Sequence, residues 1–180
     1  KLLIVLIIAG GYAASQSAIT TFLPIYVRED LDKSPWVVGA YISLAQVVGI
    51  GAQPLMGHLS DRVGRKTVLV PSLLGFGLCL MGLYAAGSGV LFVLALAATG
   101  AFLFSTIALV LAAAADLVGE ELQSTVVSLV YMALIFLSAL SPLVGGLVAD
   151  AFDVRQVFLY ASSIALATGL LAGATRWQRS

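Results

Sequence analysis

Six long apolar runs, separated by short polar segments, account for nearly the whole chain. The runs cover about residues 2–26, 35–59, 67–86, 90–115, 124–149 and 156–175. Runs of roughly 20–27 residues, rising 1.5 Å per residue in a helix, are long enough to cross a hydrocarbon core of about 30 Å. The pattern therefore predicts an all-α membrane protein with six transmembrane helices.

Charges, prolines and glycines mark the breaks between these runs. The charged segment 28–33 closes the first run, and Ser34-Pro35 is typical of an N-cap followed by a first-turn proline. Gly87-Ser88-Gly89 predicts a minimal turn between the third and fourth helices. Because that link is so short, we expect the six helices to form one unit.

The composition agrees with a membrane-embedded chain and excludes several other classes of protein. Hydrophobic residues make up 61% of the chain and charged residues 10%, whereas soluble domains carry about 25% charged residues. The net charge of zero argues against nucleic acid as a partner. One cysteine, Cys79, and one histidine, His58, cannot build an internal disulfide or a metal site. We therefore expect no cofactor and no metal, with the lipid bilayer as the surrounding solvent.

The densest cluster of charge lies between the second and third runs, at Gly57-His58-Leu59-Ser60-Asp61-Arg62-Val63-Gly64-Arg65-Lys66. Gly57 would allow close helix contact, and Gly64 suits a turn that needs a positive φ. We expect the Asp61 carboxylate to cap a neighbouring helix and to pair with Arg65. Contacts of this kind can bias a two-state equilibrium. The alternative is that the loop only anchors the topology.

This segment resembles the signature loop of the major facilitator superfamily, and the likeness extends over the whole chain. The resemblance implies a membrane transporter in which six helices form one half. It also implies that the loop residues act in gating the cytoplasmic end: Gly57, Asp61, Arg62, Gly64, Arg65 and Lys66.

Several segments resemble the carboxy-terminal half of such transporters, especially drug-efflux members of the fosmidomycin- and bicyclomycin-resistance type. They are 21–26, 100–105, 115–118, 141–146 and the pair Arg155 and Phe158. Ser141 stands where the family's antiporter motif has glycine. The chain begins with Lys1 rather than Met, so we expect it to be a piece of a longer protein whose amino-terminal six-helix half is its partner.

The distribution of basic residues predicts the orientation in the cell membrane. One side would hold six basic residues, and the other would hold three. The first set is Lys1, Arg62, Arg65, Lys66, Arg176 and Arg179, and the second is Arg28, Lys33 and Arg155. Because basic residues in short loops favour the cytoplasmic side, we expect both termini and the signature loop to be cytoplasmic.

Polar residues within the spans are the candidates for contact with a small-molecule substrate. Tyr12, Ser15, Gln16 and Thr20 recur at helical spacing, and the fourth helix offers Phe102 and Ser105. The second helix offers Gln46 and, seven residues on, Gln53. The resemblance implies that the first and fourth helices line the central cavity. Such groups can also simply link neighbouring helices.

These observations favour a secondary transporter that works by alternating access and exports an amphipathic, drug-like compound. No acidic or basic residue lies at a predicted midplane, so any coupling group would be in the other half, or transport would be uncoupled. Uptake of a sugar or organic anion, and a self-contained six-helix channel, remain alternatives. An intramembrane enzyme is disfavoured, because no nucleophile with a base and no aspartate pair lies at membrane depth.

Overall fold

The computed structural model describes residues 2–116 and 118–175, and within these ranges every long element is a helix. The six long helices are α1 (Leu2–Ile25), α2 (Pro35–Val63), α3 (Arg65–Ala86), α4 (Gly89–Ala115), α5 (Gln123–Ala151) and α6 (Gln156–Ala174). A π-helical turn, η1 (Tyr26–Asp30), extends α1, and a short 3-10 helix, η2 (Glu120–Leu122), precedes α5.

The link between α2 and α3 is much shorter than the sequence pattern indicates. Helix α2 continues past its predicted end at residue 59 to Val63, and α3 begins at Arg65 rather than at residue 67. Gly64 alone joins them, with φ of 100°, which an L side chain rarely adopts. The charged residues of the signature loop can be part of α2 and α3 because the ends of membrane-spanning helices lie in water rather than in lipid.

At the opposite end of the bundle, the turns before α2 and α4 agree with those predicted from the sequence. Pro35 occupies the first helical position of α2 after the extended N-cap residue Ser34. Gly87 and Gly89 have φ of 64° and 79° around the turn into α4. Glycine at both positions allows α4 to reverse direction within three residues.

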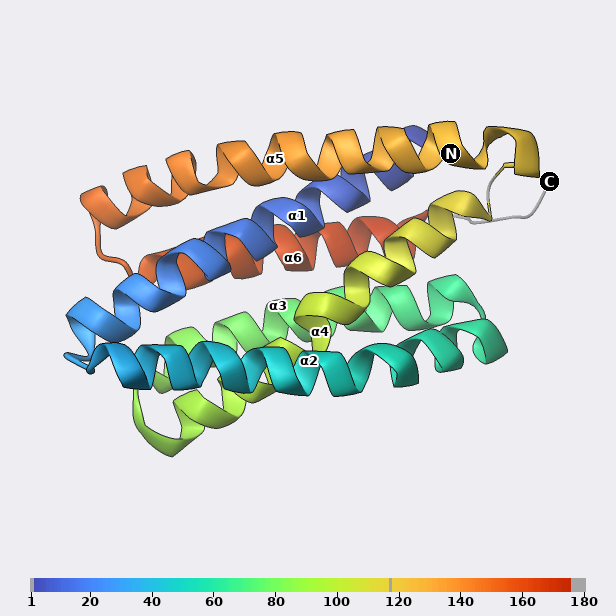
Figure 1. Ribbon diagram of the computed structural model, residues 1–180. Coiled ribbons are helices and arrows are strands. Elements are labelled where there is room, and N and C mark those ends of the chain that lie inside the picture. Colours follow the sequence, from blue (N-terminus) through green and yellow to red (C-terminus); the bar gives the residue numbers. More distant parts are fainter. Residues whose placement is uncertain (1, 117, 176–180) are drawn as a thin grey trace.

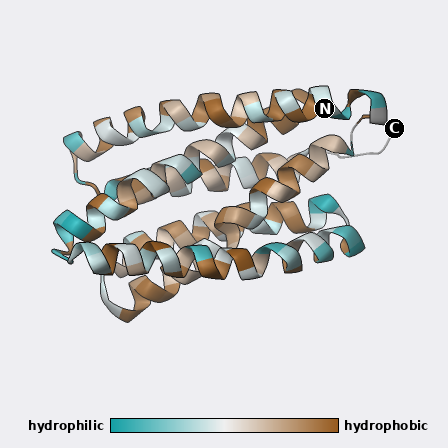
Figure 2. Cartoon of the chain, viewed as in Figure 1, coloured by the Kyte–Doolittle hydropathy of each residue, from teal (hydrophilic) through white to brown (hydrophobic). Residues whose placement is uncertain are grey.

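All six long helices are long and apolar enough to cross a membrane. Their long axes follow the length of the bundle, most hydrophilic residues lie near its two ends, and the middle is largely apolar (Figure 2). Within the described residues, the fold is therefore an all-α bundle of six membrane-spanning helices, as predicted. Lys1, Arg176 and Arg179, which contributed to the predicted orientation, lie outside the described residues.

The packing has an internal symmetry that is not visible in the sequence. Helix α1 packs mainly against α5 and α6, whereas α4 packs mainly against α2 and α3, and α3 packs against α6 (Figure 1). Exchanging the first three helices for the last three reproduces this set of main pairings. The chain is thus an inverted repeat of two three-helix units, an arrangement common among transporters.

Candidate functional site

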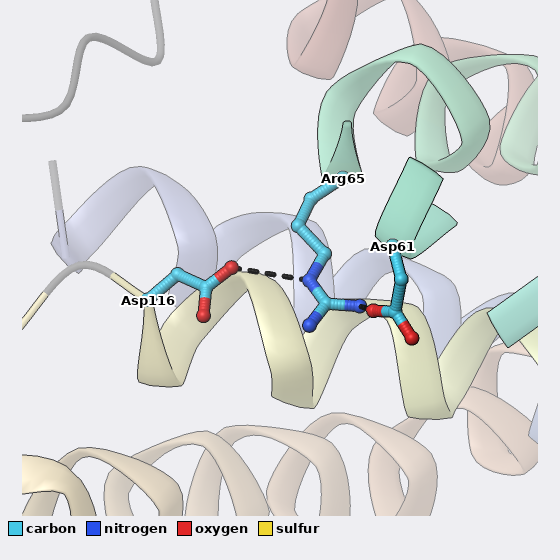
Figure 3. Close-up of polar contacts among 3 residues, drawn as sticks. All are labelled: Asp61, Arg65 and Asp116. Atoms are coloured by element: carbon cyan, nitrogen blue, oxygen red, sulfur yellow. Dashed lines mark hydrogen bonds and ion pairs between the residues drawn. The ribbon is translucent and has the colours of Figure 1, made fainter. Parts of the chain in front are cut away.

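A network of two ion pairs lies where α2, α3 and α4 meet at one end of the bundle. The Arg65 guanidinium lies between two carboxylates, with Nη1 on Asp61 Oδ1 and Nε 3.1 Å from Asp116 Oδ2 (Figure 3). Asp61 belongs to α2, Arg65 opens α3, and Asp116 directly follows α4. We call these three residues the Arg65 junction. One side chain therefore joins three helices.

The local geometry explains how the sequence builds this junction. Gly64 reverses the chain direction between Asp61 and Arg65, and its backbone N–H donates to the Ser60 carbonyl. The next basic residue, Lys66, turns away from the junction and donates from Nζ to the carbonyls of Gly173 and Thr175. Arg62 lies exposed in the last turn of α2.

Two expectations about the signature loop differ from the structure. A Cβ built at Gly57 would meet no heavy atom within 4 Å, so this glycine makes no close helix contact within the described chain. The Asp61 carboxylate pairs with Arg65 as expected, but its described partner is that guanidinium rather than a helix N-terminus. The physical reason is proximity, because the turn at Gly64 brings Arg65, four residues along the chain, beside Asp61, and its guanidinium offers a full charge.

Asp116 is a member of the junction that the sequence pattern did not reveal as a partner of Arg65. It lies far along the chain, and its contact depends on how α4 packs beside α3. A signal did exist: it is an acidic residue at the end of a span, on the membrane side predicted for the signature loop. Residues on one membrane side at span ends are the ones that can meet without entering lipid.

The predicted polar stripe of α1 does not form one open face. Tyr12 and Ser15 are fully buried. The Tyr12 hydroxyl donates to the Leu103 carbonyl of α4, and Ser15 Oγ donates to the Ala161 carbonyl of α6 at 2.7 Å. Both therefore link helices within this bundle. The stripe is divided because α1 packs against α4, α5 and α6, which cover Tyr12 and Ser15 but leave Thr20 exposed.

The remaining candidates divide into exposed and packed residues. Gln16 is half-buried and donates from Nε2 to the Leu103 carbonyl at 3.3 Å, while Thr20 and Gln46 are exposed. Phe102 packs across Gly75 of α3, since a Cβ there would be 2.8 Å from the ring. Ser105 is buried and bonds to the Ala101 carbonyl of its own helix. Gln16, Thr20 and Gln46 are thus the predicted substrate-contact residues whose side chains stay at least partly exposed in the described chain.

Helices α2 and α4 cross at small residues in the middle of the bundle. A Cβ on Gly100 would overlap the backbone of Ala45, and a Cβ on Gly49 would lie 2.7 Å from the Gly100 carbonyl oxygen. Small residues let two helix backbones touch, which strengthens packing in lipid. This crossing fixes the position of α2 relative to α4, and hence of Asp61 relative to Asp116.

Among the described residues there is no group of three or more His, Cys, Asp or Glu that could hold a metal ion. The charged chemistry near the bundle is instead concentrated at the helix ends.

Comparison with known proteins identifies the family. The profile of the Major Facilitator Superfamily matches residues 5–180. The chain belongs to the major facilitator superfamily.

Two curated relatives carry the name "Multidrug resistance protein MdtG". The protein from Yersinia enterocolitica is 30% identical over 159 residues, which cover 86% of this chain and 38% of the relative. The protein from Proteus mirabilis is 28% identical over 158 residues, covering 84% of this chain and 38% of the relative. The chain thus spans about two fifths of the length of these relatives.

Solved structures of the Escherichia coli xylose transporter XylE share the fold. One, of the proton:xylose symporter bound to 6-bromo-6-deoxy-D-glucose, superimposes with a TM-score of 0.80 at 18% identity and covers 97% of this chain and 44% of that chain. An inward-open structure gives a TM-score of 0.80 at 17% identity. At this identity the likeness concerns the fold alone.

Proposed function

We propose that this chain is the carboxy-terminal half of a multi-pass cell-membrane transporter that exports amphipathic small molecules. The likeness to two multidrug resistance proteins over most of the chain carries this proposal. Three at least partly exposed residues support it, because Gln16, Thr20 and Gln46 offer amides and a hydroxyl without a fixed charge. Such a surface suits a partly apolar ligand, whose charge, if present, would be matched by the other half.

The amino-terminal half would lie against the face that carries α2 and α5. These two helices lie on opposite sides of α1 (Figure 1). Along its described length α2 buries only Ala45, Gly49 and Ser60, and α5 likewise buries few of its residues. Family members place the substrate between two such halves near the bilayer midplane, which is the depth of Gln16 and Gln46.

The Arg65 junction would act as a latch at the cytoplasmic end during alternating access. Its ion pairs connect three helices, so separation of those helices at this end must break at least one pair. Contacts present in one state and lost in the other bias the equilibrium between the two. Arg62 is exposed and lies outside this network, so its charge would instead help to keep the loop on the cytoplasmic side of the membrane.

Uptake of a sugar is the second candidate. The fold neighbours include a proton:xylose symporter, and Gln46 and Gln53 are exposed amides on α2. Amides bind sugar hydroxyls through paired donors and acceptors. This alternative predicts a polar substrate and the opposite direction of transport.

Growth of a drug-hypersensitive strain that expresses the full-length gene tests the function. We expect increased tolerance of at least one lipophilic antibiotic, and we expect Gln16→Leu to lower that tolerance about fivefold through loss of a hydrogen bond to substrate. Thr21→Val, an exposed change on the same helix, is the matched control. Unchanged tolerance across the antibiotic panel, together with faster uptake of labelled xylose, would favour the sugar alternative.

Cysteine labelling tests the proposed orientation. In a Cys79→Ala background, Ser88→Cys in the turn between α3 and α4 should react with a membrane-impermeant maleimide added to intact cells. Gly119→Cys, exposed between α4 and α5, should react only after the cells are opened. The opposite pattern would place the signature loop outside the cell.

A further inference from the structure

Lys66, the second residue of α3, reaches the far end of another helix. Its Nζ donates to the Gly173 carbonyl at 2.7 Å and to the Thr175 carbonyl at 2.6 Å. Gly173 lies in the last turn of α6, and Thr175 is the residue that follows the helix. Carbonyls at a helix C-terminus lack partners within the helix and lie at the negative end of its dipole. The ammonium group therefore caps α6.

Arg155 makes the corresponding contact at the opposite end of the bundle. It is the residue just before α6, and its Nε donates to the Tyr84 carbonyl at 2.8 Å. Its Nη2 reaches the Tyr84 and Ala85 carbonyls, and the guanidinium lies 4.8 Å from the centre of the Tyr84 ring. Tyr84 and Ala85 belong to the last turn of α3. The guanidinium therefore caps α3.

The two caps are reciprocal because α3 and α6 are antiparallel. Each helix carries, at its start, the cation that caps the end of the other. The inverted repeat exchanges α3 with α6, so the two caps occupy equivalent places in the two three-helix units.

Close packing joins the two helices between the caps. Ser162 Oγ donates to the Gly77 carbonyl at 2.8 Å. A Cβ on Gly77 would lie 2.7 Å from Leu166, and a Cβ on Gly169 would lie 2.8 Å from Leu74. The pair is thus held at both ends and along its length.

We infer that Lys66 and Arg155 are positioning residues that hold α3 and α6 together as one rigid pair while the ends of the other helices move. The neighbouring basic residues of the signature loop then have separate tasks. Arg65 connects α3 to α2 and α4 through side chains, which can part. Lys66 connects α3 to the backbone of α6, where its loss would fray a helix.

The Arg155 cap also lies beside η1, the turn that extends α1. The Tyr26 hydroxyl donates to the Gly87 carbonyl at 2.7 Å, two residues after Ala85, whose carbonyl Arg155 binds. The Tyr26 ring packs edge-on against Phe158, 5.0 Å between centroids. Arg155 thus caps α3, and Phe158, three residues later, packs against Tyr26 of η1, the turn that extends α1. These contacts hold the carboxy-terminal end of α1 against the pair formed by α3 and α6.

Amide hydrogen exchange of the full-length protein in lipid nanodiscs tests the inference, because each cap acts on a helix that does not contain the substituted residue. Lys66→Met should speed exchange in the last turn of α6 about threefold or more, and Arg155→Met should do so in the last turn of α3. The conservative variants Lys66→Arg and Arg155→Lys should restore most of the protection. Arg62→Met, a loss of charge in the same loop, should change neither turn.

The inference predicts that each substitution speeds exchange in the helix that does not contain it. Faster exchange confined to the helix that carries the substitution, or no change in either last turn, would overturn the inference. Should Lys66→Met not yield folded protein, Lys66→Ala, which also removes the donor and the charge, supplies the same test. The measurement needs no substrate, so its result is independent of the proposed efflux.

Discussion

Arg65→Gln in the full-length protein is expected to lower the rate of drug efflux about tenfold while leaving the protein inserted and abundant. The substitution removes both ion pairs of the Arg65 junction, which joins three helices at the proposed cytoplasmic end (Figure 3). The side chains are partly exposed, so each pair contributes at most about 1 kcal/mol. Loss of two such pairs therefore shifts a two-state equilibrium by at most about thirtyfold, and about 1.4 kcal/mol of that total corresponds to the tenfold change expected here. Efflux from energised cells, normalised to surface expression, measures the effect.

Single neutralisations and a neighbouring charge separate the junction from general electrostatics. Asp61→Asn and Asp116→Asn should each have a smaller effect than Arg65→Gln, and neither should reduce efflux much further once Arg65 is replaced. Arg62→Gln removes the same charge from the same loop and should leave the rate nearly unchanged. Equal losses for Arg62→Gln and Arg65→Gln would mean that the loop acts only as a topology anchor.

Gly100→Ala is expected to destabilise the protein by about 3 kcal/mol, although it adds a single methyl group. That methyl would overlap the backbone of Ala45 where α2 crosses α4. A flexible side chain could move aside, but a helix backbone cannot, so α2 must shift as a whole. The shift would also move Asp61 away from Asp116. A lower thermal midpoint of the purified full-length protein, with reduced efflux, would report both effects.

Gly82→Ala is the matched control for this substitution. It lies within α3, and its added methyl would be 3.6 Å from the Cβ of Ala95, an ordinary van der Waals contact. Alanine also has the higher helix propensity, so the midpoint should stay the same or rise. If Gly100→Ala and Gly82→Ala behaved alike, the close crossing of α2 and α4 would contribute nothing special to stability.

Local chemistry allowed the sequence to predict the six spans and several of their ends. Apolar run length follows from the thickness of the bilayer, and Pro35, Gly87 and Gly89 mark helix ends because their backbone preferences act within a few residues. The Asp61–Arg65 pair was likewise predictable, since the two opposite charges are only four residues apart in the chain.

The sequence did not reveal how the polar groups divide between packing and an open surface. The polar residues of α1 have helical spacing, yet Tyr12 and Ser15 are buried against α4 and α6. Gln16 is half-buried, and Thr20 is exposed. In a soluble helix polarity indicates exposure, because water is the alternative environment. In lipid, a hydroxyl bound to a neighbouring backbone is equally satisfied, so polarity alone does not tell which way a residue faces.

The class of protein, the six membrane spans and the position of the charged loop followed from the amino-acid pattern alone. They depend on hydrophobicity and charge, which act within each segment separately. The contact of Arg65 with Asp116, the caps that Lys66 and Arg155 place on α6 and α3, and the symmetry of the two three-helix units became visible in the folded bundle. Those contacts join residues far apart in the chain, and they depend on where small residues such as Gly49 and Gly100 let helix backbones touch.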